Sequence, residues 1–228
     1  LGLTATLIRE DGRERDVFGL IGPKRFDAPW REIEAQGWIA PADCTEIRVS
    51  LADSERAAYA VAEFDDKYRL AAHAPAKTRV VRHLLKKHEG EQTLVIGQYL
   101  DQLDHLAETL AAPLVTGKTP VKERERLFQA FRTGELTTLV VSKVANFSVD
   151  LPEATVAIQV SGTFGSRQEE AQRLGRVLRP KSDGRTAHFY TIVTRETVDA
   201  DFAAKRQRFL AEQGYAYSIV DADDLLHG

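Results

Sequence analysis

The chain has 228 residues, of which 43% are hydrophobic and 29% charged, as in folded globular proteins. Its formal net charge of −3 excludes a general attraction to polyanions, so any binding of nucleic acid must come from a local patch. The single cysteine, Cys44, excludes a disulfide framework, and no Cys/His cluster has the spacing of zinc ligands. No apolar run approaches the roughly 20 residues that cross a membrane. We therefore expect a cytoplasmic protein without a metal site of its own.

The chain contains no methionine, and it opens on the apolar stretch LGLTATLIRED (1–11). These features predict a piece of a longer protein, part of whose chemistry lies outside these residues. Residues 1–45 show little regular pattern, with a loop at GLIGPKRFDAPW (19–30) and a short helix at REIEAQGW (31–38).

Short β-branched or apolar runs alternate with helical patterns after residue 45. Strands are predicted at 46–51, 93–98, 113–116, 137–143, 155–161 and 186–194. Helices are predicted at about 53–71, 77–88, 100–111, 120–133, 166–179 and 198–213. This alternation predicts βαβ units, and hence an α/β fold whose mainly parallel sheet has helices on both faces. Ligands of such sheets collect beyond the carboxyl ends of the strands.

The tripeptide GKT (117–119) lies between a predicted strand and a predicted helix, as it does in a phosphate-binding P-loop. That motif requires a glycine where Ala112 stands. Thr119 followed by Pro120 instead fits a helix N-cap and a first-turn proline. No apolar strand ends in an Asp–Glu pair suited to magnesium, and SIVDADD (218–224) comes nearest. The chain by itself therefore lacks a complete site for nucleoside triphosphate hydrolysis.

The stretch EEAQRLGRVLRPK (169–181), here called the arginine segment, combines cations with an apolar stripe. Gln172, Arg176 and Arg179 would share one face of a helix. Gly175 costs a helix about 1 kcal/mol relative to alanine, which close approach of a ligand to the backbone would explain. The spacing leaves two interpretations open. The segment is either a solvated basic helix or a pair of arginines that meet a phosphate bound elsewhere.

The arginine segment also resembles motif VI of superfamily 2 helicases, specifically that of the XPB family. Other segments agree in order along nearly the whole chain. LGLTATLIRED is similar to motif III with its Arg-Glu-Asp tail, TLVIGQYLDQL (93–103) to motif IV, and VTGKTPVKERERLFQAFRTGE (115–135) to the segment after it. The run 139–181 resembles motifs V to VI, and KRQRFLAEQGYAYSIV (205–220) the family's C-terminal signature.

The resemblance implies the second RecA-like lobe of an ATP-dependent DNA helicase that moves 3′→5′. Residues 1–45 would be the remnant of motif III and the connection between lobes, and 46–228 the C-terminal RecA-like domain. ATP and Mg²⁺ would be bound mainly by the first lobe, which this chain lacks. The implied partners are DNA and that N-terminal lobe, with a nuclease or a repair or transcription factor as a further candidate. Eukaryotic members have Gly-Asp-Thr where 145–147 reads Ala-Asn-Phe, which points to a bacterial relative. For such a member we expect a cytoplasmic, nucleoid-associated location.

The resemblance also assigns residues to the ATP cleft. Arg176 and Arg179 would contact the γ-phosphate and stabilise the transition state as the catalytic pair. The cleft would be supported by Gln172, Arg173, Gly175 and Asp150. Two alternatives stay open, because Arg173 could pair with a neighbouring glutamate and Asp150 could form a turn.

Four residues that follow predicted strands would hold successive phosphates of one DNA strand without reading its bases. They are Gln98, Gly117, Ser142 and Lys143. Strand-end capping is the alternative role for Gln98 and Ser142. Thr4 and Thr6 would couple the ATP state to the grip on DNA, with a plain strand as their alternative.

Two other functions remain open from the sequence. The chain could belong to another superfamily 2 motor, such as a restriction-type translocase or an RNA remodeller, although the tail at 205–220 argues against this. It could also be a non-catalytic module that docks a partner through the arginine segment.

Overall fold

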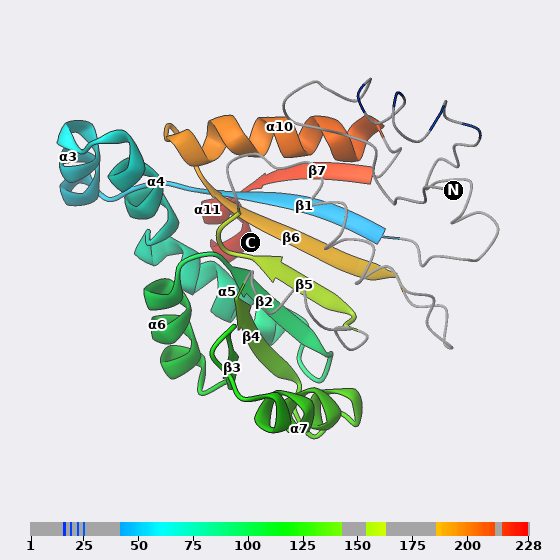
Figure 1. The fold of residues 1–228 in the computed structure, drawn as a ribbon. Helices are drawn as coiled ribbons and strands as arrows, with labels where there is room; N and C mark the ends of the chain where they lie inside the picture. The colour runs from blue at the N-terminus through cyan, green and yellow to red at the C-terminus, as the bar shows by residue number, and fades with distance from the viewer. Residues whose placement is uncertain are drawn as a thin grey trace.

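The structure is a computed structural model, and it describes residues 42–142, 154–162, 186–212 and 216–227, with isolated positions 16, 19, 22 and 25. Figure 1 shows one sheet with helices packed around it. The strands are β1 (Ala42–Val49), β2 (Thr93–Gly97), β3 (Leu114–Val115), β4 (Thr138–Ser142), β5 (Val156–Gln159), β6 (Ala187–Thr194) and β7 (Ala216–Asp221). Their order across the sheet is β3-β4-β2-β5-β6-β1-β7, and all six strand pairs are parallel. This confirms the predicted α/β fold class.

Seven helices connect or follow these strands in the described part of the chain. They are α3 (Asp53–Val61), α4 (Phe64–Ala72), α5 (Pro75–Lys87), α6 (Leu100–Leu110), α7 (Val121–Arg132), α10 (Val198–Glu212) and α11 (Ala222–His227). None of the helices in the described residues is both long enough and apolar enough to cross a membrane.

The core has two halves, one on each face of the sheet, because successive side chains of a strand point to opposite faces. Leu94 and Ile96 pack into one hydrophobic cluster, whereas Val95 between them packs into the other. The first cluster takes buried side chains from α7 and α10, and the second takes them from α5, α6 and α11. Strand β2 is buried along its whole length, which explains the apolar run of Leu94, Val95 and Ile96 at its centre.

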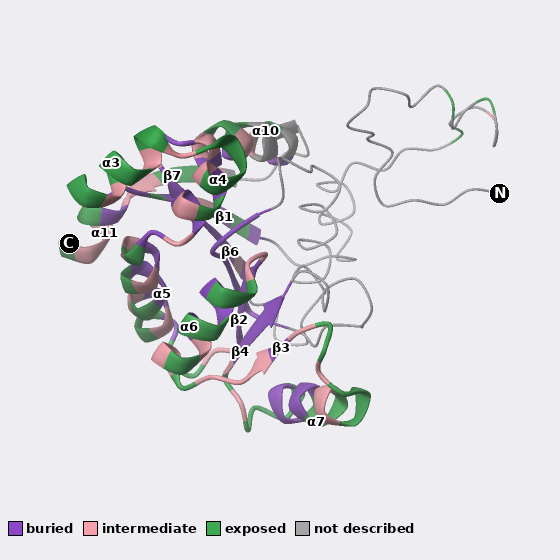
Figure 2. Cartoon of the chain, turned by 60° about the vertical axis from the view of Figure 1, so that its left-hand side comes forward, coloured by how far each residue is buried: buried purple, intermediate pink, exposed green. Residues whose placement is uncertain are grey.

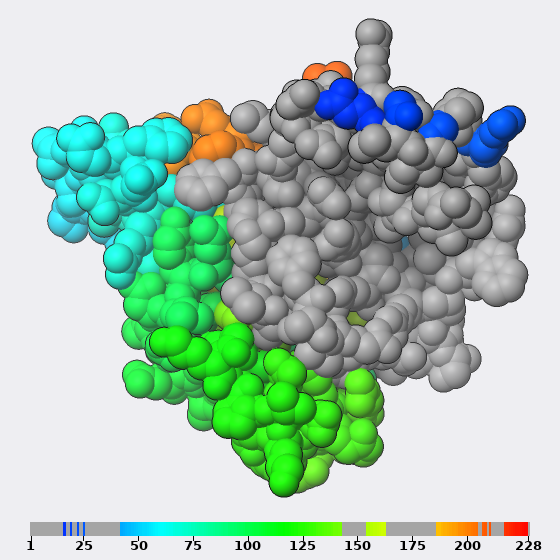
Figure 3. Space-filling view, viewed as in Figure 1, coloured from blue at the N-terminus to red at the C-terminus, as the bar shows by residue number. Residues whose placement is uncertain are grey.

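The predicted helix at 53–71 is two helices. Helix α3 begins where the carboxylate of Glu55 accepts a 2.7 Å hydrogen bond from the Ala52 backbone N–H. It ends because Ala62 has an extended backbone, with φ −73° and ψ 152°. No residue of α3 is buried, and Val61 and Phe64 at the junction are 86% and 57% exposed. Figure 2 shows α3 mostly in green, as exposed residues, and Figure 3 shows the cyan segment of α3 and α4 projecting at the left of the molecule.

The other differences from prediction occur near the edge of the sheet. Strand β7 was not predicted, because AYSIVD lies at the edge and mixes polar with apolar residues. Strand β1 begins four residues before its predicted start, with Ala42 and Cys44 buried. The predicted helix at 166–179 and the domain boundary at residue 45 stay predictions, the first because it lies outside the described residues.

Candidate functional site

Three of the predicted DNA-contacting residues lie along one end of the sheet, where the carboxyl ends of neighbouring strands meet. Gly97, the last residue of β2, pairs in register with Ser142, the last residue of β4. Val115 of β3 pairs with Val141 of β4, so the turn after β3 reaches the same edge. Since the strands are parallel, Gln98, Gly117 and Ser142 all lie at or just beyond their carboxyl ends, where ligands of such sheets bind. We call these three residues the strand-end edge.

Two oxygen atoms of the strand-end edge could each form a hydrogen bond with a ligand. The Gln98 Oε1 and Ser142 Oγ atoms are buried, and neither has a hydrogen-bond partner among the residues described by the structure. Leaving a buried polar atom unpaired costs about 1–3 kcal/mol, so each such atom requires an explanation, and a bound ligand is one. Neither oxygen caps a strand end here, which leaves the DNA-contacting role open to both.

The turn after β3 is closed by its own threonines. The Thr116 backbone N–H donates to the Thr119 hydroxyl at 2.9 Å, and the Lys118 N–H donates to the Thr116 hydroxyl at 3.1 Å. Gly117 and Lys118 are exposed at the tip. The expected N-cap role of Thr119 is wrong, because α7 begins one residue later, with Pro120 as its N-cap. The threonine hydroxyl stabilises the turn instead of the helix.

Ser161, which follows β5, was not among the predicted site residues. Its hydroxyl accepts a 2.8 Å hydrogen bond from the Gln98 backbone N–H and donates a 2.7 Å bond to Gln102 Oε1. The side-chain amide of Gln102 in turn donates to the Ala72 carbonyl oxygen at the end of α4. A serine two residues after a buried strand, at the same end of the sheet as Gln98, was the signal that could have identified its position.

Tyr99, the residue after Gln98, belongs to an aromatic and charged cluster. Its ring lies 6.0 Å from that of Tyr68 and 5.6 Å from that of His73, centroid to centroid. Burial raises the pKa of the Tyr99 hydroxyl, so it stays protonated at neutral pH. Burial also raises the pKa of Asp101, but the ion pair with Arg69 and the nearby His73 outweigh it and hold that pKa below its usual value. The guanidinium of Arg69 is therefore already paired.

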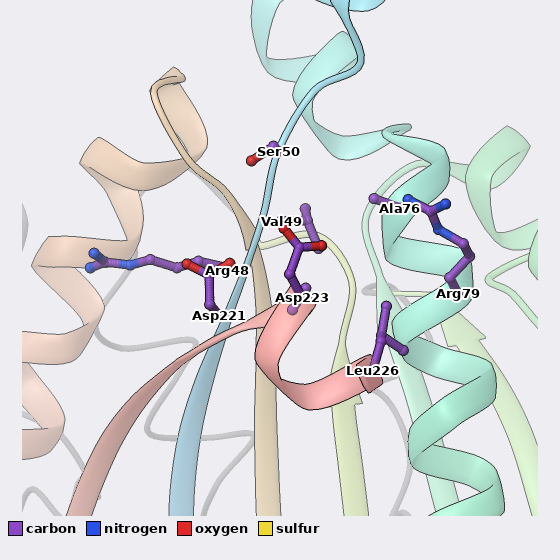
Figure 4. Close-up of a pocket in the computed structure, with 9 residues that line it drawn as sticks. Arg48, Val49, Ser50, Ala76, Arg79, Asp221, Asp223 and Leu226 are labelled. Carbon is purple, nitrogen blue, oxygen red and sulfur yellow. The ribbon is translucent and has the colours of Figure 1, made fainter. Parts of the chain in front are cut away.

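A separate small pocket lies beyond the carboxyl ends of β1 and β7 (Figure 4). Arg48 and Arg79 lie on opposite sides of it, and Asp221 and Asp223 lie between them. Two of these charges are paired elsewhere: Arg48 Nε lies 2.8 Å from a carboxylate oxygen of Glu46, and Asp221 pairs with Arg195. With about 70 Å³ of room and mixed charge, the pocket suits neither a nucleotide nor a stretch of DNA.

The remaining predicted site residues lie outside the described part of the chain. They are Thr4, Thr6, Lys143, Asp150, Gln172, Arg173, Gly175, Arg176 and Arg179. Their roles stay predictions. Among the described residues, no group of three or more His, Cys, Asp or Glu side chains could hold a metal ion.

The sequence of most of the chain matches one known protein family. The ERCC3/RAD25/XPB C-terminal helicase family matches residues 33–226. The chain belongs to this XPB family. The resemblance expected from the motifs is thereby confirmed, and the match covers the strand-end edge as well as the arginine segment.

Individual proteins named XPB are also similar to this chain in sequence. The "DNA 3'-5' helicase XPB" of Kineococcus radiotolerans is 73% identical, and that of Mycobacterium tuberculosis is 69% identical, each over 99% of this chain. The XPB subunit of the general transcription and DNA repair factor IIH of Drosophila melanogaster is 40% identical over the whole chain. The chain covers 40%, 41% and 30% of these relatives, so it spans well under half of their length.

Solved helicase structures share the fold of this XPB-family chain. Yeast Dbp5, bound to RNA and ADP BeF3, superposes with a TM-score of 0.64 at 15% identity over 93% of this chain and 49% of its own. The Escherichia coli DEAD-box protein SrmB gives 0.57 at 17% identity, over 81% of this chain and 93% of its own. At these identities the likeness establishes the RecA-like fold alone.

Proposed function

We propose that this chain is the second lobe of a 3′→5′ ATP-dependent DNA helicase or translocase. In this proposal the strand-end edge holds the backbone of one DNA strand. Arg176 and Arg179 reach across to ATP and Mg²⁺ that the preceding lobe of the same protein binds. The names of the relatives that are 73% and 69% identical support the DNA substrate and the direction of movement. We expect the protein to act in the bacterial cytoplasm, on nucleoid DNA.

The observation that carries the proposal is the alignment of Gln98, Gly117 and Ser142 on three neighbouring strands. Adjacent strands lie about 4.8 Å apart, so such an edge offers polar groups at a spacing comparable with successive phosphates of a nucleic-acid strand. Its side chains are neutral, and the chain's net charge is −3. Hydrogen bonds from neutral groups and backbone N–H would let a motor hold the phosphates and still release them as it moves.

In this proposal, Arg176 and Arg179 take part in ATP hydrolysis itself. A guanidinium presented to a transferring phosphoryl group stabilises charge that develops in the transition state, and this accelerates hydrolysis by about 10³–10⁵-fold. The groups that cradle ATP would come from the preceding lobe. Hydrolysis would therefore require both lobes, closed on each other.

The test uses the full-length protein, with Arg176→Ala and Arg179→Ala variants of it. We expect DNA-stimulated ATP hydrolysis to fall by about 10³-fold or more in each variant, with DNA affinity nearly unchanged. Duplexes with a 3′ DNA tail should be unwound by the wild type, and matched RNA duplexes should not. Hydrolysis by residues 1–228 alone, full activity of both variants, or preferential unwinding of RNA would each contradict the proposal.

A further inference from the structure

Three consecutive residues after β5 are each held by a different part of the fold. Val160 donates its N–H to the Ile96 carbonyl at 2.9 Å and accepts a 2.8 Å hydrogen bond from Lys77 Nζ. Ser161 is bonded to Gln98 and Gln102, and Gly162 accepts a hydrogen bond from the Tyr68 hydroxyl. The bonds reach β2, α4, α5 and α6. This stretch, 160–162, is the last described part of the chain before residue 186.

Ser161 makes the one direct bond between this stretch and the residue after β2. It is 3% exposed, and its single hydroxyl proton is committed to Gln102 Oε1. A lone pair on the same oxygen therefore faces the Gln98 N–H at 2.8 Å. Because the amide of Gln102 is itself tied to Ala72, the direction of every bond in this series is fixed.

The packing at Gly97 shows how closely the two strand ends approach. A Cβ atom at Gly97 would lie 3.0 Å from Ser161 Oγ, 3.0 Å from Val160 Cγ2 and 2.8 Å from Leu103 Cδ2. Glycine is needed here for space rather than for backbone freedom. A displacement of Gln98 would therefore press directly on the end of β5, since a close-packed interior transmits strain.

The hydrogen bond between Ser161 and Gln98 joins a residue that we propose contacts DNA to the stretch of chain that precedes the arginine segment. Gln98 belongs to the strand-end edge, which we propose holds DNA. From Gly162 the sequence continues to the arginine segment at 169–181, which we propose meets ATP. We infer that Ser161 is a positioning residue that links DNA binding at Gln98 to the placement of the arginine segment. This inference rests on the proposed function.

The test replaces the hydroxyl in full-length protein by Ser161→Ala. We expect the kcat of DNA-stimulated ATP hydrolysis to fall by between about fivefold and a hundredfold, the range that misplacing a reacting group produces. The kcat without DNA, the KM for ATP and the affinity for DNA should each stay within about twofold, since the residue touches neither ligand. An equal fall in kcat with and without DNA, or no fall in either, would overturn the inference.

Two further variants separate linkage from plain loss of stability. Ile47→Val removes one buried methylene from β1, which is separated from β5 by β6, and should leave the ratio of stimulated to unstimulated hydrolysis unchanged. Gln102→Leu removes the acceptor of the Ser161 proton. If the bonds act in series, adding Ser161→Ala to Gln102→Leu should lower the ratio much less than it does in the wild type. Additive effects, or an equal fall in Ile47→Val, would count against Ser161.

A failure of the inference can be told from a failure of the proposed function. If the wild-type protein shows no DNA-stimulated hydrolysis, the proposed function fails and Ser161 has nothing to link. If the wild type is stimulated and Ser161→Ala is stimulated equally, the proposed function stands and the inference alone is wrong.

Discussion

Lys77 of α5 and Asp199 of α10 form an ion pair inside the domain, with 2.7 Å between Lys77 Nζ and Asp199 Oδ2 and exposures of 1% and 2%. Lys77 Nζ also donates to the Val160 carbonyl, and the same Asp199 oxygen accepts from the Thr194 backbone N–H at 3.1 Å. A buried charge is tolerated only when its partners satisfy it. The pair therefore joins two helices to the ends of β5 and β6.

Removing one charge of this pair should be costly, because the other would stay buried without its partner. We expect Lys77→Met or Asp199→Asn to lower the free energy of unfolding by about 3–5 kcal/mol. The double variant Lys77→Met/Asp199→Asn should lose less than the sum of the singles. Urea unfolding followed by circular dichroism measures all three. Losses below about 1 kcal/mol in both singles would show that the pair contributes little.

The close approach at Gly97 makes a second prediction, which depends on volume alone. Gly97→Ala should lower the free energy of unfolding by about 1–3 kcal/mol, because the added methyl overlaps Leu103, Val160 and Ser161. Leu103→Ala removes the nearest of these atoms, although it leaves a cavity of its own. The double variant should thus be more stable than the sum of the two losses predicts. Strict additivity in urea unfolding would mean that the overlap is relieved by other movements.

A third prediction concerns pH and two neighbouring histidines near the amino end of β6. His188 of β6 lies 4.9 Å from His88, ring to ring, and His88 bonds to the Tyr190 hydroxyl at 2.8 Å. Burial and the nearby His88 lower the pKa of His188 below 6.5, although Asp43 and Glu91 act in the opposite direction and Lys87 in the same one. Burial also raises the pKa of Tyr190 to about 12, so this hydroxyl keeps its proton.

A His whose pKa is lowered by folding binds its proton more tightly in the unfolded chain. Its contribution to stability is therefore present above the unfolded pKa, near 6.5, and is lost as the pH falls below it. We expect the free energy of unfolding to decrease between pH 7 and pH 5, and His188→Gln to flatten that decrease. His227→Gln, at an exposed position, is the matched control. An unchanged slope in His188→Gln would show that other groups cause the pH dependence.

The central strands were predictable because their burial leaves a simple mark on the sequence. TLVIG and TLVVS each have an unbroken apolar run of three residues at their centre, as is typical of strands covered on both faces. The edge strand β7 carries no such mark, since exposure lets Ser218 stand among its apolar residues. The split between α3 and α4 was equally hidden, because it depends on the backbone at Ala62 within a favourable helical composition.

The candidate site was predictable to the extent that a strand end determines position. Gln98 and Ser142 follow apolar runs, and parallel pairing then requires them to lie at one edge. For Ser161 the same signal gives the position alone, because its role comes from hydrogen bonds to Gln98 and Gln102, which are 63 and 59 positions away. Contacts of that separation depend on the order of the strands, and local periodicity carries no information about that order.

The last prediction separates stability from function at Ser142. Ser142 is 2% exposed, and its buried hydroxyl has no hydrogen-bond partner among the described residues that would offset its lost hydration. Ser142→Ala should leave the free energy of unfolding unchanged or raise it by up to about 1 kcal/mol. If the hydroxyl instead binds a DNA phosphate, the same variant of the full-length protein should bind single-stranded DNA about fivefold more weakly.

The matched control for Ser142→Ala is Ser218→Ala, which removes an exposed hydroxyl from β7 at the far edge of the sheet. Fluorescence anisotropy with labelled single-stranded DNA, at one fixed salt concentration, measures affinity, and urea unfolding measures stability. Weaker binding of DNA with undiminished stability, seen at Ser142 and absent at Ser218, would identify the hydroxyl as a ligand contact. If Ser142→Ala loses stability instead and binds DNA normally, the buried hydroxyl is a structural group and the grip on DNA must lie elsewhere along the strand-end edge.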